Sequence, residues 1–330
     1  IHVQAVHPED NVGTNLADEL TSLNYYTILS DEEPASVYAN ANQRSFRIAE
    51  PLQINMEKDS LHMRFYSPVG IKEVTVMAKS PTMDEYVEFV YIDDIPAFAD
   101  IKTSIKVLEK GLYRTESGKV LQFSAEEMNP ASLSLKIACN DPYWTKISQI
   151  KAKWYIKFVL NGGNPVTGTP NKNWWGIRPV HCREAVALFL NIGYMCTLEK
   201  FQQRVSTFQG TFLDNNRYPV DTSTLISRLE NLSGFDIGLI YSGNGVSGLG
   251  GGRTWGVYQK SFLYHYENSG GCCSTIFHEL GHCLGYNHNS TMTYGQWASG
   301  CADVFYKNNI KDFPVNSHTI LKSRSNPNIY

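Results

Sequence analysis

The sequence lacks any apolar run long enough to cross a membrane. The nearest one, Ala185–Leu190, is broken at Asn191, whereas a spanning helix needs about 18 or more consecutive apolar residues. The sequence also lacks a strong charge of one sign, because its 330 residues carry a formal net charge of −3. Since nucleic acids are bound mainly through clustered positive charge, we expect neither a membrane span nor a nucleic acid partner.

The seven cysteines lack the paired C-x-x-C spacing that is typical of a structural zinc site. An odd count leaves at least one free thiol even if all the others pair. Cys272 or Cys273 could bridge to Cys301, or every thiol could be reduced, and the sequence leaves both alternatives open. Cys283 is expected to behave as a small buried hydrophobe.

The first residue is Ile1 rather than an initiator methionine, and no charged-then-apolar leader follows it. We expect the chain to be a processed or truncated form whose targeting segment is gone. As a separate expectation, the protein is secreted or located at the cell surface. The sequence gives no signal about its oligomeric state.

The most informative pattern that is present is H-E-x-x-H-x-x-G-x-x-H, which begins at His278. On a helix, His278 and His282 lie about 40° apart on one face and roughly 6 Å apart along the axis, so both imidazoles can reach one zinc ion. Gly285 permits a turn with positive φ that brings back His288 as a third ligand. Three protein ligands leave a position for water, as in a catalytic site, and Glu279 can accept a proton from that water.

This motif is followed by Ser290-Thr291-Met292-Thr293-Tyr294. Together they resemble the metzincin clan of zinc endopeptidases, whose Met-turn forms a hydrophobic floor under the metal. The resemblance implies that the three histidines bind Zn²⁺, that Glu279 is the general base and that Met292 is the floor. It also implies that Tyr294, in the S-x-M-x-Y form of astacins and serralysins, helps to bind the metal or to stabilise the oxyanion.

The resemblance covers residues 278–294 and departs from the familiar subfamilies in two ways. Only three residues separate His288 from Met292, a shorter connection than in astacins, and Asn289 is not the residue that marks a known subfamily. The sequence therefore indicates the clan and no particular subfamily.

Apolar and polar residues alternate in short runs over the first 140 or so residues, which favours antiparallel strands. The apolar positions of these runs are Leu61, Met63, Phe65, Val74, Val76, Leu133, Leu135 and Ile137. We predict an antiparallel β-sandwich over residues 1–145, either a permanent module or a prosegment. Cys139 could in principle cap the zinc as a thiolate, as a matrixin prosegment cysteine does, but the sequence around it differs, and we favour a permanent module.

Residues 146–330 are predicted to form a second domain. Alternating apolar residues over Ile150–Leu160 indicate a strand, Pro179 begins a helix, Ser223–Leu232 forms another, and Phe235–Tyr241 is a buried strand. This order of elements, followed by the zinc helix, is similar to that of metzincin catalytic domains. The expected fold class is therefore α+β, with a twisted mixed sheet, a backing helix and a zinc-binding active-site helix.

Residues Gly243–Gly248 fit the pattern G-x-G-x-x-G, but the glycine-rich segment after them is a poor helix former, which argues against a dinucleotide site. We interpret this stretch as a loop that enters an edge strand around Trp255–Gln259. By the resemblance, that strand lies above the zinc and pairs with an extended peptide substrate. His181 and His265 are expected to be packed or solvated residues rather than ligands.

The sequence thus predicts a secreted zinc-dependent endopeptidase that acts on a protein or peptide bound in extended form. A zinc amidase with a non-protein substrate is an alternative that the same residues would serve. A second alternative is an adhesion or glycan-binding protein with a vestigial metal site, although the intact Glu279 argues against an inert site.

Overall fold

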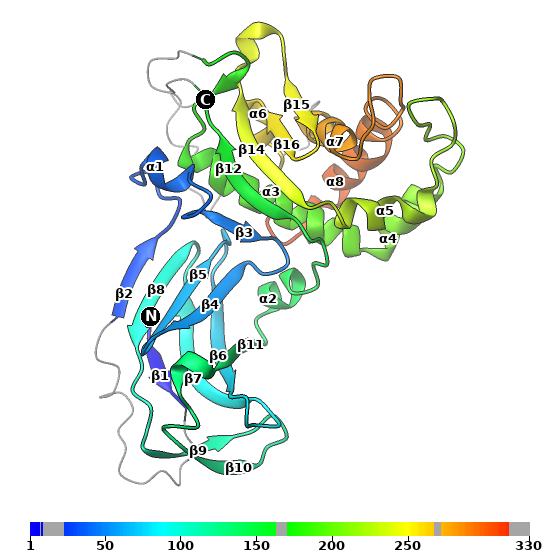
Figure 1. Ribbon diagram of the computed structural model, residues 1–330. Helices are drawn as coiled ribbons and strands as arrows, with labels where there is room; N and C mark the ends of the chain where they lie inside the picture. The colour runs from blue at the N-terminus through cyan, green and yellow to red at the C-terminus, as the bar shows by residue number, and fades with distance from the viewer. Residues whose placement is uncertain (7, 9–22, 163–169, 267–271, 317–330) are drawn as a thin grey trace. The chain divides into compact units, whose positions relative to one another are not determined.

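The chain forms two compact units in the computed structural model (Figure 1). The first comprises residues 1–28 and 52–145, and the second comprises residues 29–51 and 146–330. The described residues are 1–6, 8, 23–162, 170–266 and 272–316. Antiparallel sheets and several helices confirm the predicted α+β class.

The first unit consists mainly of two four-stranded antiparallel sheets, an arrangement compatible with the predicted β-sandwich. One has the order β1-β7-β6-β11 (Val3–Ala5, Val87–Ile95, Ile71–Lys79, Ser134–Cys139), and the other has the order β2-β8-β5-β4 (Leu23–Thr27, Ala99–Ser104, Ser60–Phe65, Leu52–Glu57). The remaining elements are the hairpin β9–β10 (Lys110–Arg114, Val120–Ser124), the 3₁₀ turn η2 (Pro130–Ser132) and the start of α2 (Pro142–Ile147). Alternate residues Leu61, Met63 and Phe65 of β5 are buried, as their period of two predicts.

The second unit is built around a mixed sheet with the order β15-β16-β14-β12-β3. Its strands are Gly248–Gly251, Thr254–Val257, Gly234–Ile240, Tyr155–Leu160 and Ser45–Arg47, and β13 (Trp174–Trp175) also pairs with β14. The pairs β12–β14 and β14–β16 are parallel, whereas β3 and β15 run antiparallel to their neighbours. Apolar strand β14 is buried along nearly its whole length, as expected for an interior strand.

Two strand predictions are wrong in their limits. The strand predicted over Ile150–Leu160 begins only at Tyr155, because the backbone N–H of Lys153 donates to the Glu230 carbonyl at the end of helix α5 (Thr222–Glu230) rather than to a neighbouring strand. The indole N–H of Trp154 also donates to this helix, at the Leu229 carbonyl. The edge strand predicted around Trp255–Gln259 is β16, which lies inside the sheet between β14 and β15. The edge is formed by β15, within the segment predicted to be a loop.

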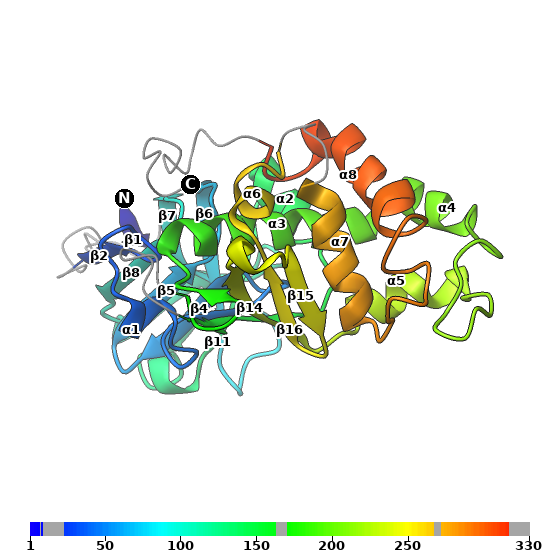
Figure 2. The same cartoon turned by 90° about the horizontal axis from the view of Figure 1, so that it is seen from above.

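Helix α3 (Pro179–Thr197) begins at the predicted proline and is buried along almost its whole length. Its Phe189 ring packs against the rings of Trp154, Phe235 and Trp255, with centroid separations of 6.0, 4.9 and 4.9 Å respectively. Helix α7 (Cys272–Cys283) runs beside β15 and β16 (Figures 1 and 2). The other helical elements are α1 (Ala35–Tyr38), α4 (Glu199–Ser206), η3 (Ser242–Asn244), α6 (Gln259–Leu263), the π-helical turn η4 (Ala298–Asp303), α8 (Val304–Asn309) and η5 (Ile310–Asp312).

Residues 29–51 belong to the second unit, which corrects the single boundary predicted after residue 145. The buried Arg183 of α3 donates to the carbonyl of Leu29 (2.6 Å) and to the carboxylate of Asp31 (2.9 Å). Tyr38 donates its hydroxyl proton to the carbonyl of Ile177 (2.7 Å), and β3 adds an antiparallel strand to β12. These contacts join sequence positions that no local pattern links.

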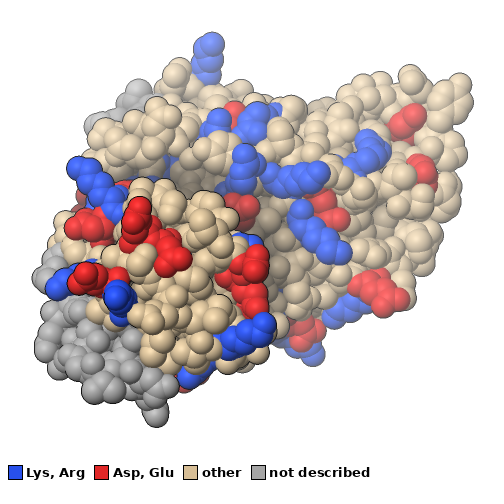
Figure 3. Space-filling view, turned by 60° about the horizontal axis from the view of Figure 1, so that its bottom comes forward, with Lys and Arg blue, Asp and Glu red and all other residues tan. Residues whose placement is uncertain are grey.

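Among the described residues, no helix is both long enough and apolar enough to span a bilayer. On the face drawn in Figure 3, basic and acidic side chains are interspersed, in keeping with the small net charge. The expected absence of a nucleic acid partner stays a prediction.

Candidate metal centre

Helix α7 presents His278 and His282 on one face, with their Nε2 atoms 3.1 Å apart. The opposite nitrogen of each ring is held by the backbone: Nδ1 of His278 donates to the carbonyl of Thr293, and Nδ1 of His282 donates to the carbonyl of Tyr286 (2.7 Å). A ring that carries its proton on Nδ1 has a free lone pair on Nε2, so both ligand atoms are directed toward one point.

The helix ends in a turn that requires Gly285. Gly285 N–H donates to the carbonyl of His282 (2.9 Å), and Tyr286 N–H donates to the carbonyl of Gly281 (3.1 Å), which together form a Schellman motif. The φ angle of Gly285 is +94°, a conformation that strains a residue with a Cβ. The turn places Nε2 of His288 3.0 Å from Nε2 of His282.

The three histidines therefore form one cluster, whose candidate ligand atoms all lie within 4.8 Å of one another. Tetrahedral zinc with nitrogen ligands at about 2.0–2.1 Å requires them to be roughly 3.3 Å apart, close to the two shorter separations. Burial lowers the pKa of His278 and of His282, which favours the neutral ring that binds metal. Within the described part of the chain, the cluster includes no fourth His, Cys, Asp or Glu. The donor set fits a zinc ion with an open position.

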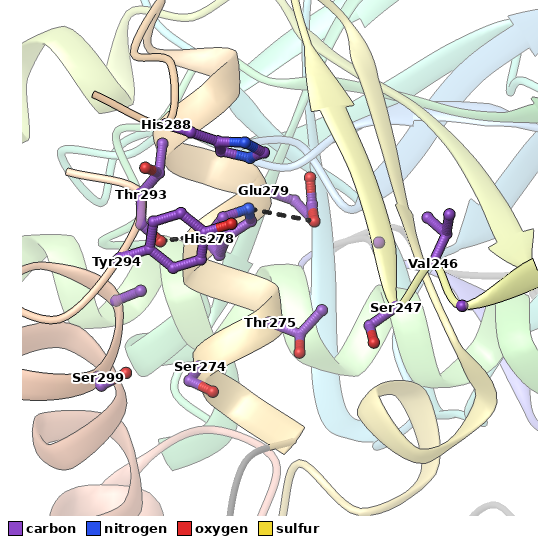
Figure 4. A pocket seen from close by; sticks show the side chains of 13 residues that line it. Val246, Ser247, Ser274, Thr275, His278, Glu279, His288, Thr293, Tyr294 and Ser299 are labelled. Atoms are coloured by element: carbon purple, nitrogen blue, oxygen red, sulfur yellow. Dashed lines mark hydrogen bonds and ion pairs between the residues drawn. The ribbon is translucent and has the colours of Figure 1, made fainter. Parts of the chain in front are cut away.

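Glu279 lies beneath edge strand β15, with 2% of its surface exposed. Its Oε1 is 3.9 Å from Nε2 of His278, and its Oε2 has no hydrogen-bond partner among the described residues (Figure 4). Burial raises the pKa of Glu279 to about 8, so the metal-free site favours a protonated carboxyl group near neutral pH. The positive charge of a bound metal ion would favour the carboxylate again.

The glycines of β15 make room for this carboxyl group. A Cβ at Gly248 would collide with Oε1 of Glu279, and a Cβ at Gly250 would lie 2.5 Å from the Glu279 carbonyl oxygen and 2.8 Å from Oε2. Strand and helix thus approach more closely than side chains on the strand would permit. The glycine-rich sequence is explained by this close approach rather than by a phosphate-binding turn.

Tyr294 lies beside the histidines, and Met292 lies next to helix α7 at Gly281. The Tyr294 ring is 4.6 Å from the His278 ring and 5.1 Å from the His288 ring between centroids, and 55% of its surface is exposed. Met292 is fully buried, and its carbonyl oxygen lies so close to Gly281 that a Cβ there would collide with it. The short link after His288 therefore does not keep Tyr294 away from the histidines.

A cavity of about 420 Å³ opens beside this centre, between the segment leading into β15 and helix α7 (Figure 4). Besides His278, Glu279, His288 and Tyr294, its lining includes the hydroxyl side chains of Ser247, Ser274, Thr275, Thr293 and Ser299. The cavity gives a second molecule access to the open side of the histidine cluster.

A scan against protein-family models found no match, and neither did searches of curated proteins and of solved structures. The interpretation of the centre therefore rests on its own residues and geometry.

The sequence did not point to one part of the centre, the segment Leu213–Arg217 between α4 and α5. Its Asn215 side chain hydrogen-bonds the backbone on both sides of Tyr286, and its Arg217 donates to the carbonyl of Asn289 (3.0 Å). Only the bias toward Asn and Asp in this segment could have indicated a structured turn, and nothing local could have indicated its partner.

The other histidines singled out in the sequence are packed residues, as expected. His265 is buried and contacts the Tyr306 hydroxyl (2.8 Å) and the Glu184 carboxylate (3.3 Å), and burial lowers the pKa of His181 to about 3. Neither belongs to the metal cluster.

The cysteines do not form the bridge considered from the sequence. Cys301 is a free, buried thiol, and the side chains of Cys272 and Cys273 lie outside the described residues. Cys283 is buried, as predicted, and donates to the carbonyl of Thr254 (3.2 Å). Cys139, at the end of β11, donates to the carbonyl of Lys72 (3.3 Å).

Proposed function

We propose that the chain is a zinc-dependent endopeptidase similar to the metzincins. The observation that carries the proposal is the convergence of three imidazole Nε2 atoms beside a buried, unpartnered carboxyl oxygen, at the edge of an open cavity. A structural zinc site is closed by four protein ligands, whereas three ligands and a nearby acid–base group suit catalysis. The order of sheet, backing helix α3 and helix α7, which resembles a metzincin catalytic domain, adds support by analogy.

His278, His282 and His288 would hold the zinc ion through Nε2. When bound, zinc supplies Lewis acidity, which makes water nucleophilic near neutral pH and polarises a carbonyl group. Glu279 would accept a proton from the attacking water on its carboxylate and later deliver it to the leaving amine. Its location beneath β15 orients this carboxyl group and shields it from bulk water. The hydroxyl group of Tyr294 would donate a hydrogen bond to the oxyanion that develops on the substrate.

Strand β15 offers a way to bind the substrate in extended form. One side pairs with β16, and no other strand of the described residues pairs with the opposite side. An exposed strand edge presents backbone N–H and C=O groups with which an extended peptide can pair. Since Gly248 and Gly250 lie directly against Glu279, a peptide on this edge would run close to the proposed base.

Cleavage-site profiling with a proteome-derived peptide library tests the proposal, with Glu279→Ala as the inactive control. We expect zinc-dependent cleavage at internal peptide bonds that disappears when zinc is removed with a chelator and in the variant. An active zinc hydrolase that cleaves only non-protein amides would contradict the endopeptidase assignment and favour the amidase alternative. The secreted location is a separate prediction.

A further inference from the structure

The third histidine is held differently from the other two. His278 and His282 are fixed by helix α7 and by hydrogen bonds from Nδ1 to backbone carbonyls. His288 lies in an exposed turn, and no protein group among the described residues accepts a hydrogen bond from its Nδ1. The position of its Nε2 therefore depends on how firmly the backbone of the turn is held.

The Asn215 side chain hydrogen-bonds this backbone at two points just before His288. Its Oδ1 accepts a hydrogen bond from Asn287 N–H (2.7 Å), and its Nδ2 donates to the carbonyl of Gly285 (3.1 Å). Because one partner is a donor and the other an acceptor, an amide satisfies both groups in a single orientation. One side chain thus links the end of helix α7 to the residue that precedes the third histidine.

The loop that carries Asn215 is ordered by its own contacts. Leu213 and Pro219 form an isolated antiparallel bridge, and Oδ1 of Asp214 accepts hydrogen bonds from Asn216 N–H (2.8 Å) and Tyr218 N–H (2.9 Å). These hydrogen bonds lie within the loop, so they fix the backbone around Asn215 independently of its contacts with the histidine turn. Asn215 is therefore presented by a preorganised support.

The same loop also holds the turn after His288. Leu213 accepts hydrogen bonds at its carbonyl from Ser290 Oγ (2.7 Å) and Thr291 N–H (3.1 Å), and its own N–H donates to Thr291 Oγ1 (2.8 Å). After His288, the loop thus holds the chain through the backbone of Leu213. Before His288, the loop holds the chain through the Asn215 side-chain amide.

We propose that Asn215 is a positioning residue for the metal site, which holds Gly285 and Asn287 so that Nε2 of His288 meets the other two ligand atoms. The proposal rests on the proposed function only in that the three histidines bind zinc, and it does not require peptide cleavage. Residues that orient a metal ligand from outside the coordination sphere typically change metal affinity by about 10–100-fold when they are removed.

Asn215→Ala in the full chain tests this role, with zinc affinity measured by competition against a chelator of known affinity. We expect affinity to fall by about 10–100-fold, while the metal-free protein stays folded, with only the small drop in melting midpoint that the loss of two hydrogen bonds causes. Asn216→Ala is the matched control, because the hydrogen bond of Asn216 to Asp214 uses its backbone N–H, and its zinc affinity should equal that of wild type. Asn215→Asp keeps the acceptor for Asn287 but loses the donor for Gly285, so it too should bind zinc more weakly.

Cobalt substitution separates positioning from a general structural effect. The visible absorption of Co²⁺ reports the geometry of its ligands, so we expect a changed spectrum in Asn215→Ala and a wild-type spectrum in Asn216→Ala. A wild-type spectrum and zinc affinity in Asn215→Ala would overturn the proposal, as would an equal loss of affinity in the control. If the wild-type chain binds no zinc, the metal site and the proposed function fail together with this role.

Discussion

At the scale of single residues, Glu279 is the side chain on which the proposed chemistry depends most directly. Glu279→Gln preserves the shape that fits beneath Gly248 and Gly250, but it removes the proton acceptor. We predict that the variant retains zinc and that its turnover falls by about 10²–10⁴-fold. Metal analysis and steady-state cleavage of a peptide substrate measure the two quantities.

Glu230→Gln is a suitable control for this experiment. Burial also raises the pKa of Glu230, but the residue lies at the end of α5 and outside the metal cluster. Its substitution should leave turnover at the wild-type level. Near-normal cleavage by Glu279→Gln would remove Glu279 from the mechanism.

Tyr294 allows the role of a hydroxyl group to be separated from that of a ring. Because the ring lies against His278 and His288, Tyr294→Phe should preserve this packing and the zinc content. If the hydroxyl stabilises the oxyanion, kcat and kcat/KM should fall together by about 10–10³-fold, with KM little changed. Unchanged kinetics in Tyr294→Phe would show that the residue is only a packed aromatic, and the astacin-like role would be withdrawn.

The sequence predicted the residues of the centre that are close together in the chain. The spacing of His278 and His282 follows from helix geometry, and Gly285 indicates the turn before His288. Asn215 could not be predicted, because its contacts with the turn span about 70 residues and depend on how α4 and α5 are packed. Local patterns identify ligands, whereas the groups that hold them depend on the tertiary structure.

At the scale of elements, the close contact between strand β15 and helix α7 can be tested by substituting the glycines of the strand. A Cβ at Gly248 meets the flexible end of Glu279, so Gly248→Ala should displace the carboxyl group and lower kcat at least about tenfold with little loss of stability. A Cβ at Gly250 meets the helix backbone, so Gly250→Ala should instead destabilise the fold by about 1–3 kcal/mol.

Thermal unfolding and peptide cleavage measure these two effects, and Leu249→Ala is the control within the same strand. Its side chain leaves the strand on the opposite face to those two glycine positions, so its substitution should not displace Glu279. Equal kcat values for Gly248→Ala and wild type would contradict the close approach of β15 to the proposed base.

The same glycines explain why the edge strand was assigned to the wrong residues. Strands are recognised in a sequence by β-branched and aromatic side chains, and β15 has none of these residues. It is ordered by pairing with β16 and by contact with α7, neither of which leaves a local pattern. The apolar strand β14, in contrast, was predicted nearly to its limits.

At the scale of the whole molecule, the chain is two compact units whose division is only partly visible in the sequence. The boundary predicted after residue 145 coincides with a boundary of the units, but residues 29–51 fold with the second unit. They do so through pairing of β3 with β12 and through the buried Arg183. Such long-range contacts lie beyond what composition and periodicity can indicate.

Zinc should stabilise the second unit, because all three proposed ligands belong to it. A ligand that binds only the folded state adds about 2.7 kcal/mol of stability when its free concentration is 100 times its Kd. Tryptophan fluorescence is a suitable probe, since Trp154, Trp174, Trp175, Trp255 and Trp297 lie in the second unit and only Trp144 lies in the first. We predict that a chelator lowers the melting midpoint followed by this signal.

His288→Ala provides the control that ties this stabilisation to the centre. Removing one of three ligands should weaken zinc affinity by orders of magnitude, so the melting midpoint of the variant should no longer respond to zinc or to a chelator. Circular dichroism recorded before heating would establish that the variant is folded. A midpoint that is the same with and without zinc in the wild-type chain would mean that the histidine cluster does not hold the metal, because ligand binding confined to the folded state necessarily shifts the unfolding equilibrium.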